Sequence, residues 1–183
     1  MDEASLRIET SRLYLRPPRT EDFEGWAAMM ADAEGSRFIG GPQSRADAWR
    51  GLMMVAGCWS LQGYCLFSVI EKSSGRFIGR VGPLYPEGWP APEIGWALLR
   101  DAWRRGYATE SVTASIDWTF EHLGWREMIH LIAPENHASQ ALARKLGSRN
   151  QGPGELPAPR QNVRVDVWGQ SRADWDKHRR SRA

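Results

Sequence analysis

A turn in the second half of the chain carries residue types that suit an anion-binding site. It reads Trp103-Arg104-Arg105-Gly106-Tyr107-Ala108-Thr109-Glu110 and joins a predicted strand ending near Leu99 to a predicted helix. The first N–H groups of a helix have no intrahelical partner and attract anions. Gly106 would let the main chain approach a phosphate closely, and Arg104 and Arg105 add positive charge. Spacing alone leaves open an ordinary helix start with solvated arginines.

Other reactive side chains show weaker patterns. His130 lies in an apolar stretch, where a histidine is usually a structural residue, and His137 has no partner near it in the sequence. Cys58 and Cys65 have no neighbouring base that would activate a thiol, and they are too few for a disulfide framework. No spacing typical of metal ligands occurs, so we expect no metal.

The elements that must position the turn follow from apolar periodicity and turn residues. Helices are predicted after Thr20 and after Ser44 as caps, and over 108–123 and 138–146. The predicted strands are Leu13–Arg16, Tyr64–Glu71, Arg76–Val81, Glu93–Leu99, Met128–Ala133 and a strand around Val163 to Val167. This order predicts an α/β (α+β) chain with one central, mostly antiparallel sheet flanked by helices and a βαβα segment in its second half.

Two segments near the end of the chain are harder to interpret. The stretch between Gly147 and Val163 is rich in proline and glycine, and it is either a loop or an altered strand. Val163, Val165 and Val167 alternate with polar residues and with Trp168, as in a half-buried strand. One or two helical turns are predicted from Ser171, within a basic tail over about 171–183 that we expect to be solvated, with weak phosphate contact as the alternative.

Bulk properties limit the class of protein. The chain has 183 residues, 42% hydrophobic and 25% charged, with a formal net charge of +2. We expect one domain over 1–183, with its core over about 9–170. The near-neutral charge argues against nucleic acid as a partner. The acidic start and the lack of a long apolar run argue against a signal peptide or membrane span, so we expect a cytoplasmic protein.

The turn at Gly106 resembles the acyl-CoA-binding motif of the GNAT superfamily of N-acetyltransferases, usually written Q/R-x-x-G-x-G/A. Gly106 and Ala108 match its small residues, whereas Trp103 occupies the Gln/Arg position. The string Gly106 to Glu110 is similar to the RimJ/RimL-type group. The resemblance covers roughly residues 9–147. Three further segments resemble that group and follow in the same order: Glu9-Thr10-Ser11-Arg12-Leu13-Tyr14-Leu15-Arg16-Pro17, Glu93-Ile94-Gly95-Trp96, and Pro134 to Ser139 with Lys145-Leu146-Gly147.

The resemblance implies a GNAT-like fold with splayed fourth and fifth strands, and direct transfer of acetyl from acetyl-CoA to a primary amine. Glu93 is then the candidate base, directly or through a water, since a partly buried carboxylate there could have a raised pKa; the alternative is a structural hydrogen bond at the strand start. Ser139 is the candidate proton donor to the thiolate, with water as the alternative, because Ala143 stands where many family members have a tyrosine. Asn136 and Ser139 would contact the cofactor, although either could simply cap the helix that follows.

The same resemblance assigns the remaining binding residues. The pyrophosphate would lie on the main chain of Arg104, Arg105, Gly106, Tyr107, Ala108 and Thr109, and the pantetheine arm would pair with Ala97, Leu98 and Leu99. The acceptor groove would be built from the first two helices, the loop between them and the segment before Glu93. Its residues would be Trp26, Phe38, Gly40, Gly41, Tyr85 and Trp89, unless these aromatics pack in the core.

Several matters stay open at the level of sequence. The acceptor could be a small-molecule amine or a protein N-terminus, and a homodimer is possible. Because Trp103, Ala143 and Ser148 depart from the family pattern, an alternative is a non-catalytic acyl-CoA-binding module of the same fold. A nucleotide-binding protein is a third hypothesis, which the lack of GxGxxG and GxxxxGK[ST] opposes.

Overall fold

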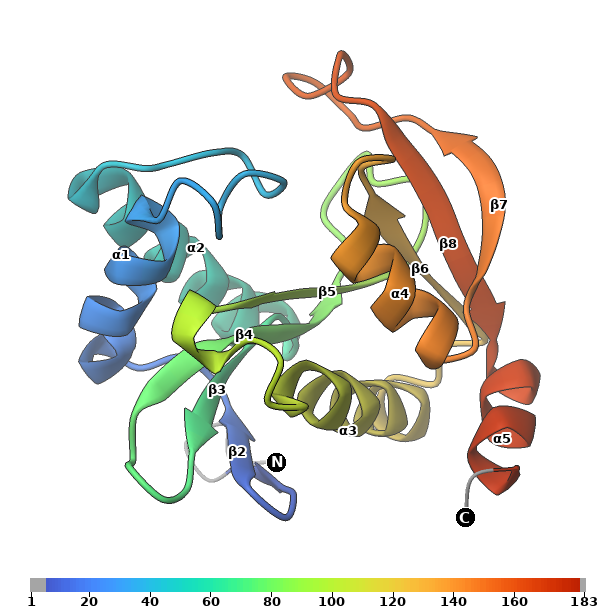
Figure 1. Cartoon of the computed structure of the whole chain (residues 1–183), viewed down its shortest axis with the longest axis horizontal. Helices are drawn as coiled ribbons and strands as arrows, with labels where there is room; N and C mark the ends of the chain where they lie inside the picture. Colours follow the sequence, from blue (N-terminus) through green and yellow to red (C-terminus); the bar gives the residue numbers. More distant parts are fainter. Residues whose placement is uncertain (1–5, 182–183) are drawn as a thin grey trace.

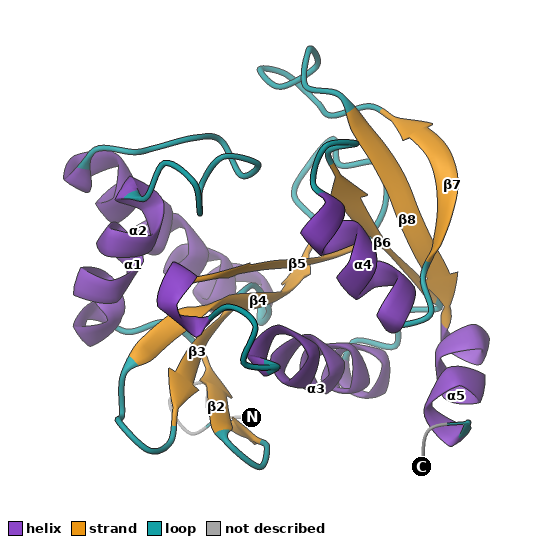
Figure 2. Ribbon diagram, viewed as in Figure 1, coloured by secondary structure: helices purple, strands orange, loops and turns teal. Residues whose placement is uncertain are grey.

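The computed structural model describes residues 6–181 and shows a mixed sheet of eight strands with helices packed on it (Figures 1 and 2). The strand order is β1-β2-β3-β4-β5-β6-β8-β7, and only β5 and β6 run parallel. This confirms the predicted fold class. The strands are β1 (Ile8–Glu9), β2 (Leu13–Arg16), β3 (Phe67–Glu71), β4 (Phe77–Leu84), β5 (Glu93–Leu98), β6 (Glu127–Ile132), β7 (Arg149–Gly154) and β8 (Val165–Ser171).

The helices begin and end close to the predicted positions. They are α1 (Phe23–Ala31), α2 (Arg45–Gln62), α3 (Tyr107–His122), α4 (His137–Lys145) and α5 (Arg172–Arg180), with short 3-10 turns η2 (Thr20–Asp22) and η3 (Arg100–Ala102). Ser44 caps α2 by accepting the Asp47 N–H at 3.1 Å, as predicted. Thr20 instead opens the η2 turn, where the Asp22 carboxylate accepts the Arg19 N–H at 2.8 Å. None of these helices has both the length and the apolarity to span a membrane.

The core lies between the sheet and the apolar faces of α1, α2 and α3. On α3, the predicted stripe is buried at Val112, Ile116 and Phe120. On α1, Trp26 packs against Phe77 of β4 with ring centroids 6.2 Å apart. These contacts fix α3 across β4 and β5, and thereby fix its first turn beside the end of β5.

The last two strands differ from the sequence prediction. The segment after Gly147 forms strand β7, which pairs antiparallel with β8, so it is an altered strand followed by a loop that projects beyond both strands in Figure 1. The face of β8 that carries Trp168 is covered by α4, so alternation with a solvated face does not hold there. Trp168 was expected to face outward, yet it is 4% exposed and packs against Ile132 and Ala143.

The basic end of the chain is more ordered than the sequence indicates. Residues 172–180 form helix α5, and Trp175 in its middle is 2% exposed. The Trp175 indole donates to Asp117 Oδ1 of α3 at 2.7 Å, and Arg179 pairs with Asp117 Oδ2 at 3.2 Å. These contacts attach α5 to the rest of the protein up to residue 181, and the final tail residues 182 and 183 lie outside the described residues.

Candidate active site

The sheet divides between β5 and β6. The two strands are in register only at Glu93 and Ile129, where the Ile129 N–H donates to the Pro92 carbonyl at 2.8 Å. Figure 1 shows β5 crossing the centre of the molecule, while β6 stands beside β8 at the right. The splayed strands that the resemblance implies are therefore β5 and β6. We call the region beyond Glu93, where these two strands are no longer paired, the slot.

Side chains take the places of the missing strand–strand bonds at this division. In a parallel ladder the next bond would run from the Leu131 N–H to the Ile94 carbonyl. Instead, the Leu131 N–H donates to Glu93 Oε1 at 3.2 Å, and the Ile94 carbonyl accepts from His130 Nδ1 at 2.7 Å. Glu93 and His130 therefore hold the strands apart and keep the main-chain groups paired.

Glu93 combines deep burial with a poised carboxylate. It is 7% exposed, and its Oε2 accepts the Trp89 indole N–H at 2.6 Å. Burial raises the pKa of Glu93 to about 7, although the hydrogen bonds from Leu131 and Trp89 act in the opposite direction. A carboxylate with this pKa can accept a proton near neutral pH, as a general base must.

His130 serves the same region structurally. Burial lowers its pKa to about 4, so the ring is neutral at pH 7. Since Nδ1–H donates to a carbonyl, Nε2 is free to accept, and it accepts the Ser148 hydroxyl at 3.1 Å. Ser148 in turn accepts from Gln170 Nε2 at 3.0 Å. Ser148, which departs from the family pattern, is therefore the link that fixes the His130 ring.

The free edge of β5 corrects one expectation about main-chain pairing. The Ile94 carbonyl and the Leu98 carbonyl both point toward the slot, where they accept from His130 and from the Trp103 indole at 2.9 Å. The Leu99 N–H points the other way and donates to Ile78 of β4 at 2.9 Å. Main-chain groups alternate in direction along a strand. The unused groups that face the slot are therefore the N–H and carbonyl of Trp96 and the N–H of Leu98, whereas the main-chain groups of Ala97 and the N–H of Leu99 face β4.

The turn before α3 has the geometry of an anion cradle. Arg104 and Gly106 adopt left-handed conformations with φ of 58° and 81°, and successive turns of this kind direct N–H groups toward one point. The first α3 hydrogen bond runs from the Glu110 N–H to the Gly106 carbonyl at 3.1 Å. The N–H groups of Gly106, Tyr107, Ala108 and Thr109 precede it and remain outside the helix ladder.

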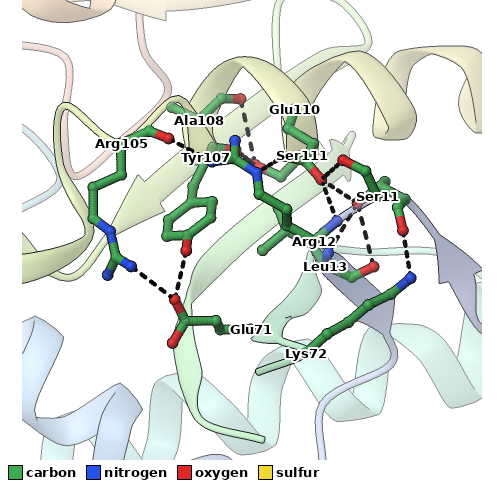
Figure 3. Close-up of polar contacts among 11 residues, drawn as sticks. Ser11, Arg12, Leu13, Glu71, Lys72, Arg105, Tyr107, Ala108, Glu110 and Ser111 are labelled. Carbon is green, nitrogen blue, oxygen red and sulfur yellow. Dashed lines mark hydrogen bonds and ion pairs between the residues drawn. The ribbon is translucent and has the colours of Figure 1, made fainter. Parts of the chain in front are cut away.

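Two side chains of this turn, Tyr107 and Arg105, are engaged by Glu71 of β3. Tyr107 donates its hydroxyl to Glu71 Oε1 at 2.5 Å, and Arg105 Nη2 lies 3.2 Å from the same oxygen (Figure 3). Hydrogen bonds from Ser74 and Tyr107 lower the pKa of Glu71, which keeps it ionised. Tyr107 can therefore serve a ligand only through its main chain, and part of the Arg105 charge is balanced by Glu71. Sequence reasoning missed Glu71 because it lies 36 residues away on β3.

A second carboxylate ties the turn to the start of the sheet. Glu110 accepts from Thr10 Oγ1 at 2.6 Å, from Ser11 Oγ at 3.0 Å and from the Arg12 N–H at 2.8 Å. Arg12 Nη1 also donates to the Arg105 carbonyl at 2.9 Å, as Figure 3 shows. The segment around Thr10 to Arg12 and the string ending at Glu110, both singled out by sequence, therefore form one bracket that holds the cradle in shape.

Helix α4 places two candidate residues at the slot. The Asn136 Oδ1 caps the helix by accepting the Ser139 N–H at 3.1 Å. Ser139 Oγ accepts the Trp96 indole N–H at 3.3 Å, so Trp96 spans from β5 to α4. This contact uses an oxygen lone pair of Ser139 and leaves its own proton available for donation. The Trp96 indole also meets the His130 ring edge-on, with centroids 4.7 Å apart.

The predicted acceptor residues fall into two groups. Phe38 and Tyr85 are exposed on the loops before α2 and before β5, and Trp89 reaches Glu93. Trp26 does not line a groove, because it is 1% exposed and lies in the core. The correction follows from its place on the apolar face of α1.

Three loops meet above this region. Arg160 Nη2, from the loop after β7, lies 3.3 Å from the position of a Cβ on Gly40 in the α1–α2 loop. Pro157 of the same loop lies 3.5 Å from the corresponding position on Gly88, before β5. The β7–β8 loop therefore lies close both to the α1–α2 loop, at the predicted Gly40, and to the β4–β5 loop that leads to Glu93.

A divided sheet, an anion cradle at a helix start and a buried carboxylate at the point of division together define an acyltransferase of the GNAT class. A family model described as "Acetyltransferase (GNAT) domain" matches residues 12–149, and the chain belongs to this family. Within the described residues 6–181, no cluster of His, Cys, Asp or Glu could hold a metal ion.

Individual relatives agree with this assignment. The "Uncharacterized N-acetyltransferase p20" of Bacillus licheniformis is 29% identical over 148 residues, which is 79% of this chain and 83% of that protein. An acetyltransferase structure from Agrobacterium tumefaciens has a TM-score of 0.79 at 29% identity, covering 91% of this chain and 95% of the other. The ribosomal-protein-S5-alanine acetyltransferase of Vibrio fischeri, at 18% identity and TM-score 0.68 over 93% of this chain and 99% of the other, shares the fold.

Proposed function

We propose that the protein transfers the acetyl group of acetyl-CoA directly to a primary amine, with Glu93 as the general base and Ser139 as the proton donor. The observation that carries this proposal is the Glu93 carboxylate, buried where β5 and β6 part, with a pKa raised to about 7. The family membership supports the reaction class, and the residue roles rest on the geometry.

The groups around the slot fit coenzyme A. The N–H groups of Gly106, Tyr107, Ala108 and Thr109 suit a pyrophosphate, because they lie at a helix start with its positive dipole end. The unused main-chain groups of Trp96 suit the amides of a pantetheine arm, since strand-like pairing needs only main-chain donors and acceptors. Bound acetyl-CoA would supply a thioester carbonyl for an amine to attack.

Glu93 would act on the amine. An amine enters mostly as an ammonium ion at neutral pH and must lose a proton before it can attack. With its pKa near 7, Glu93 takes that proton directly or through one water molecule, and Trp89 and Leu131 hold the carboxylate in place. Because both carboxylate oxygens are held by donors, the group does not need to reorganise during the transfer.

Ser139 would act on the leaving sulfur. The Trp96 indole donates to Ser139 Oγ, so the hydroxyl proton of Ser139 is not used in that contact and can be donated to another acceptor. Ser139 then donates its proton to the thiolate. Trp96 is a positioning residue in this scheme, because it orients the hydroxyl and does not give up its own proton.

The test is thiol release from acetyl-CoA with a panel of primary amines, for the wild type and for Glu93→Gln. We expect Glu93→Gln to reduce kcat by about 10²- to 10⁴-fold, the usual contribution of a general base, while acetyl-CoA still raises the melting temperature. Glu121→Gln, on the exposed face of α3, is the matched control and should keep wild-type rates. Cofactor binding without transfer to any amine would favour the non-catalytic module instead.

A further inference from the structure

A partly buried arginine, Arg80, lies on the face of the sheet that packs against α1. In register across three strands stand Ser68 of β3, Arg80 of β4 and Ala97 of β5, and residues directly opposite one another point to the same face. Ser68 donates to Asp22, just before α1, and the Arg80 guanidinium lies 4.8 Å from the Trp26 ring centroid of α1. Arg80 therefore points toward α1 and the loops around the site.

The Arg80 guanidinium has no acid partner. Its flat face stacks on Trp26, which leaves the N–H donors in the guanidinium plane unused by that contact. Within the described residues 6–181, no carboxylate lies within ion-pair distance of it, and no hydrogen bond from its N–H groups is found. Burial lowers the pKa of Arg80 to about 10, so it stays charged at neutral pH although the site opposes the charge. A partly buried guanidinium without an acid partner is well suited to pair with an anionic ligand.

A second arginine adds to the same field. Arg160 reaches over the site from the β7–β8 loop to Gly40, and its positive charge further lowers the pKa of Arg80. The neighbouring acids are already engaged. Asp22 pairs with Arg16 at 2.8 Å, and Asp32 of the α1–α2 loop pairs with Arg100 at 3.2 Å. The described residues thus leave two guanidinium groups facing one site without a compensating carboxylate.

Glycines stand between Arg80 and Glu93 on this face of the sheet. Gly95 lies between Glu93 and Ala97 on the same face of β5, and its partner across β4 is Gly82. A Cβ at Gly95 would make ordinary contacts with Leu66 Cδ2 at 3.8 Å and Leu84 Cδ2 at 4.0 Å. A ligand that joins Arg80 to Glu93 would pass over this glycine-bearing part of β5.

From these contacts we propose that the acceptor is a small amine that also carries an anionic group, a carboxylate or a phosphate, which Arg80 and Arg160 bind while the amine lies toward Glu93. This inference rests on the proposed acetyl transfer and selects its substrate class. Arginine suits such an anion because its planar fork binds carboxylate and phosphate through paired hydrogen bonds. The same charges oppose polyamines and aminoglycoside-like polycations, and a protein N-terminus supplies no such anion by itself.

The test compares amines in matched pairs. Thiol release from acetyl-CoA is measured with a free amino acid and its amide, and with an aminoalkyl phosphate and its alcohol; the first pair tests a carboxylate and the second a phosphate. We expect kcat/KM for the anionic member of at least one pair to exceed that of its neutral partner by roughly tenfold to hundredfold, mainly through KM. Equal or faster transfer to the neutral members, or to a polyamine, would overturn the inference and leave the proposed function intact.

Variants assign the preference to the two arginines. Arg80→Gln and Arg160→Gln should each remove most of the preference for the anionic amine, mainly by raising its KM, while the KM for acetyl-CoA stays within about twofold. Arg160 is exposed, so its replacement should not impair folding. Arg50→Gln, an exposed site on α2, is the matched control. If the preference for the anionic amine survives both Arg80→Gln and Arg160→Gln, the two arginines do not bind the anion. If the wild type is inactive with every amine, the proposed acetyl transfer is refuted instead.

Discussion

Replacing Glu93 with glutamine should lower the catalytic rate. It should also remove a part of the free energy of unfolding that depends on pH. Burial raises the folded-state pKa of Glu93 from 4.5 to about 7. A raised carboxyl pKa means that the folded state binds the proton more tightly than the unfolded state. Its contribution to stability is therefore complete below about pH 4.5 and is lost as the pH rises toward about 7.

The size of this effect follows from the shift. One pKa unit corresponds to about 1.4 kcal/mol, so a shift from 4.5 to about 7 corresponds to about 3 kcal/mol in the limit of high pH. Between about pH 5 and pH 8, roughly 2–3 kcal/mol of that is lost in the wild type. Glutamine has no proton to lose, so the variant lacks this term. It does place an amide beside the Trp89 indole donor, at a cost of about 1–3 kcal/mol at every pH.

Urea unfolding of the wild type and of Glu93→Gln at about pH 5 and pH 8 gives the stability difference between them at each pH. The pH-independent cost of the amide is the same at both pH values and cancels when the two differences are compared. We expect Glu93→Gln to be less stable than the wild type at about pH 5, and to recover by roughly 2–3 kcal/mol relative to it at about pH 8. The wild-type kcat/KM should rise with pH through about 7 as Glu93 loses its proton. An identical stability difference at both pH values would show that the carboxyl does not titrate near 7, and the reasoning on its role as a base would fail.

Four further substitutions test other parts of the site and fold. Gly106→Ala should weaken acetyl-CoA binding by about tenfold, because a Cβ at φ 81° is strained and would lie 3.2 Å from Arg12 Nη2; calorimetric titration measures this. Ser139→Ala should lower kcat by about 10²-fold and leave acetyl-CoA binding unchanged, and Trp96→Phe should have a smaller effect of the same kind on steady-state rates. Trp175→Ala should destabilise the protein by about 3–5 kcal/mol in urea unfolding with little change in KM, since Trp175 is 2% exposed.

The sequence was informative wherever the structure depends on local patterns. The strand, turn and helix around Gly106 and the cap at Ser44 follow from short-range rules for helix starts and glycine conformations. The same rules could not show that Glu71 and Arg12 hold the turn, because these residues come from β3 and from the segment before β2. Contacts over such sequence separations exist only in the folded chain.

The errors at Trp26 and Trp168 have different causes. For Trp26, the helical spacing that predicted an apolar face also implied burial, and the groove assignment set that evidence aside. For Trp168, alternation places a residue outward only when that face of the strand is solvated, and helix α4 covers the face of β8 that carries Trp168. After Ser171 the basic composition predicted a solvated tail. Burial of one apolar side chain, Trp175, instead packs this segment against the protein as helix α5.

The free edge of β5 also bears on how the protein avoids aggregation. An unpaired strand edge usually invites another polypeptide strand to add to it. Here the Ile94 and Leu98 carbonyls are already occupied by His130 and the Trp103 indole, so the exposed edge is reduced to little more than Trp96. A polypeptide strand needs a longer row of unpaired main-chain N–H and carbonyl groups to add to a sheet. The division in the sheet can therefore stay open to a narrow ligand while it remains closed to other chains.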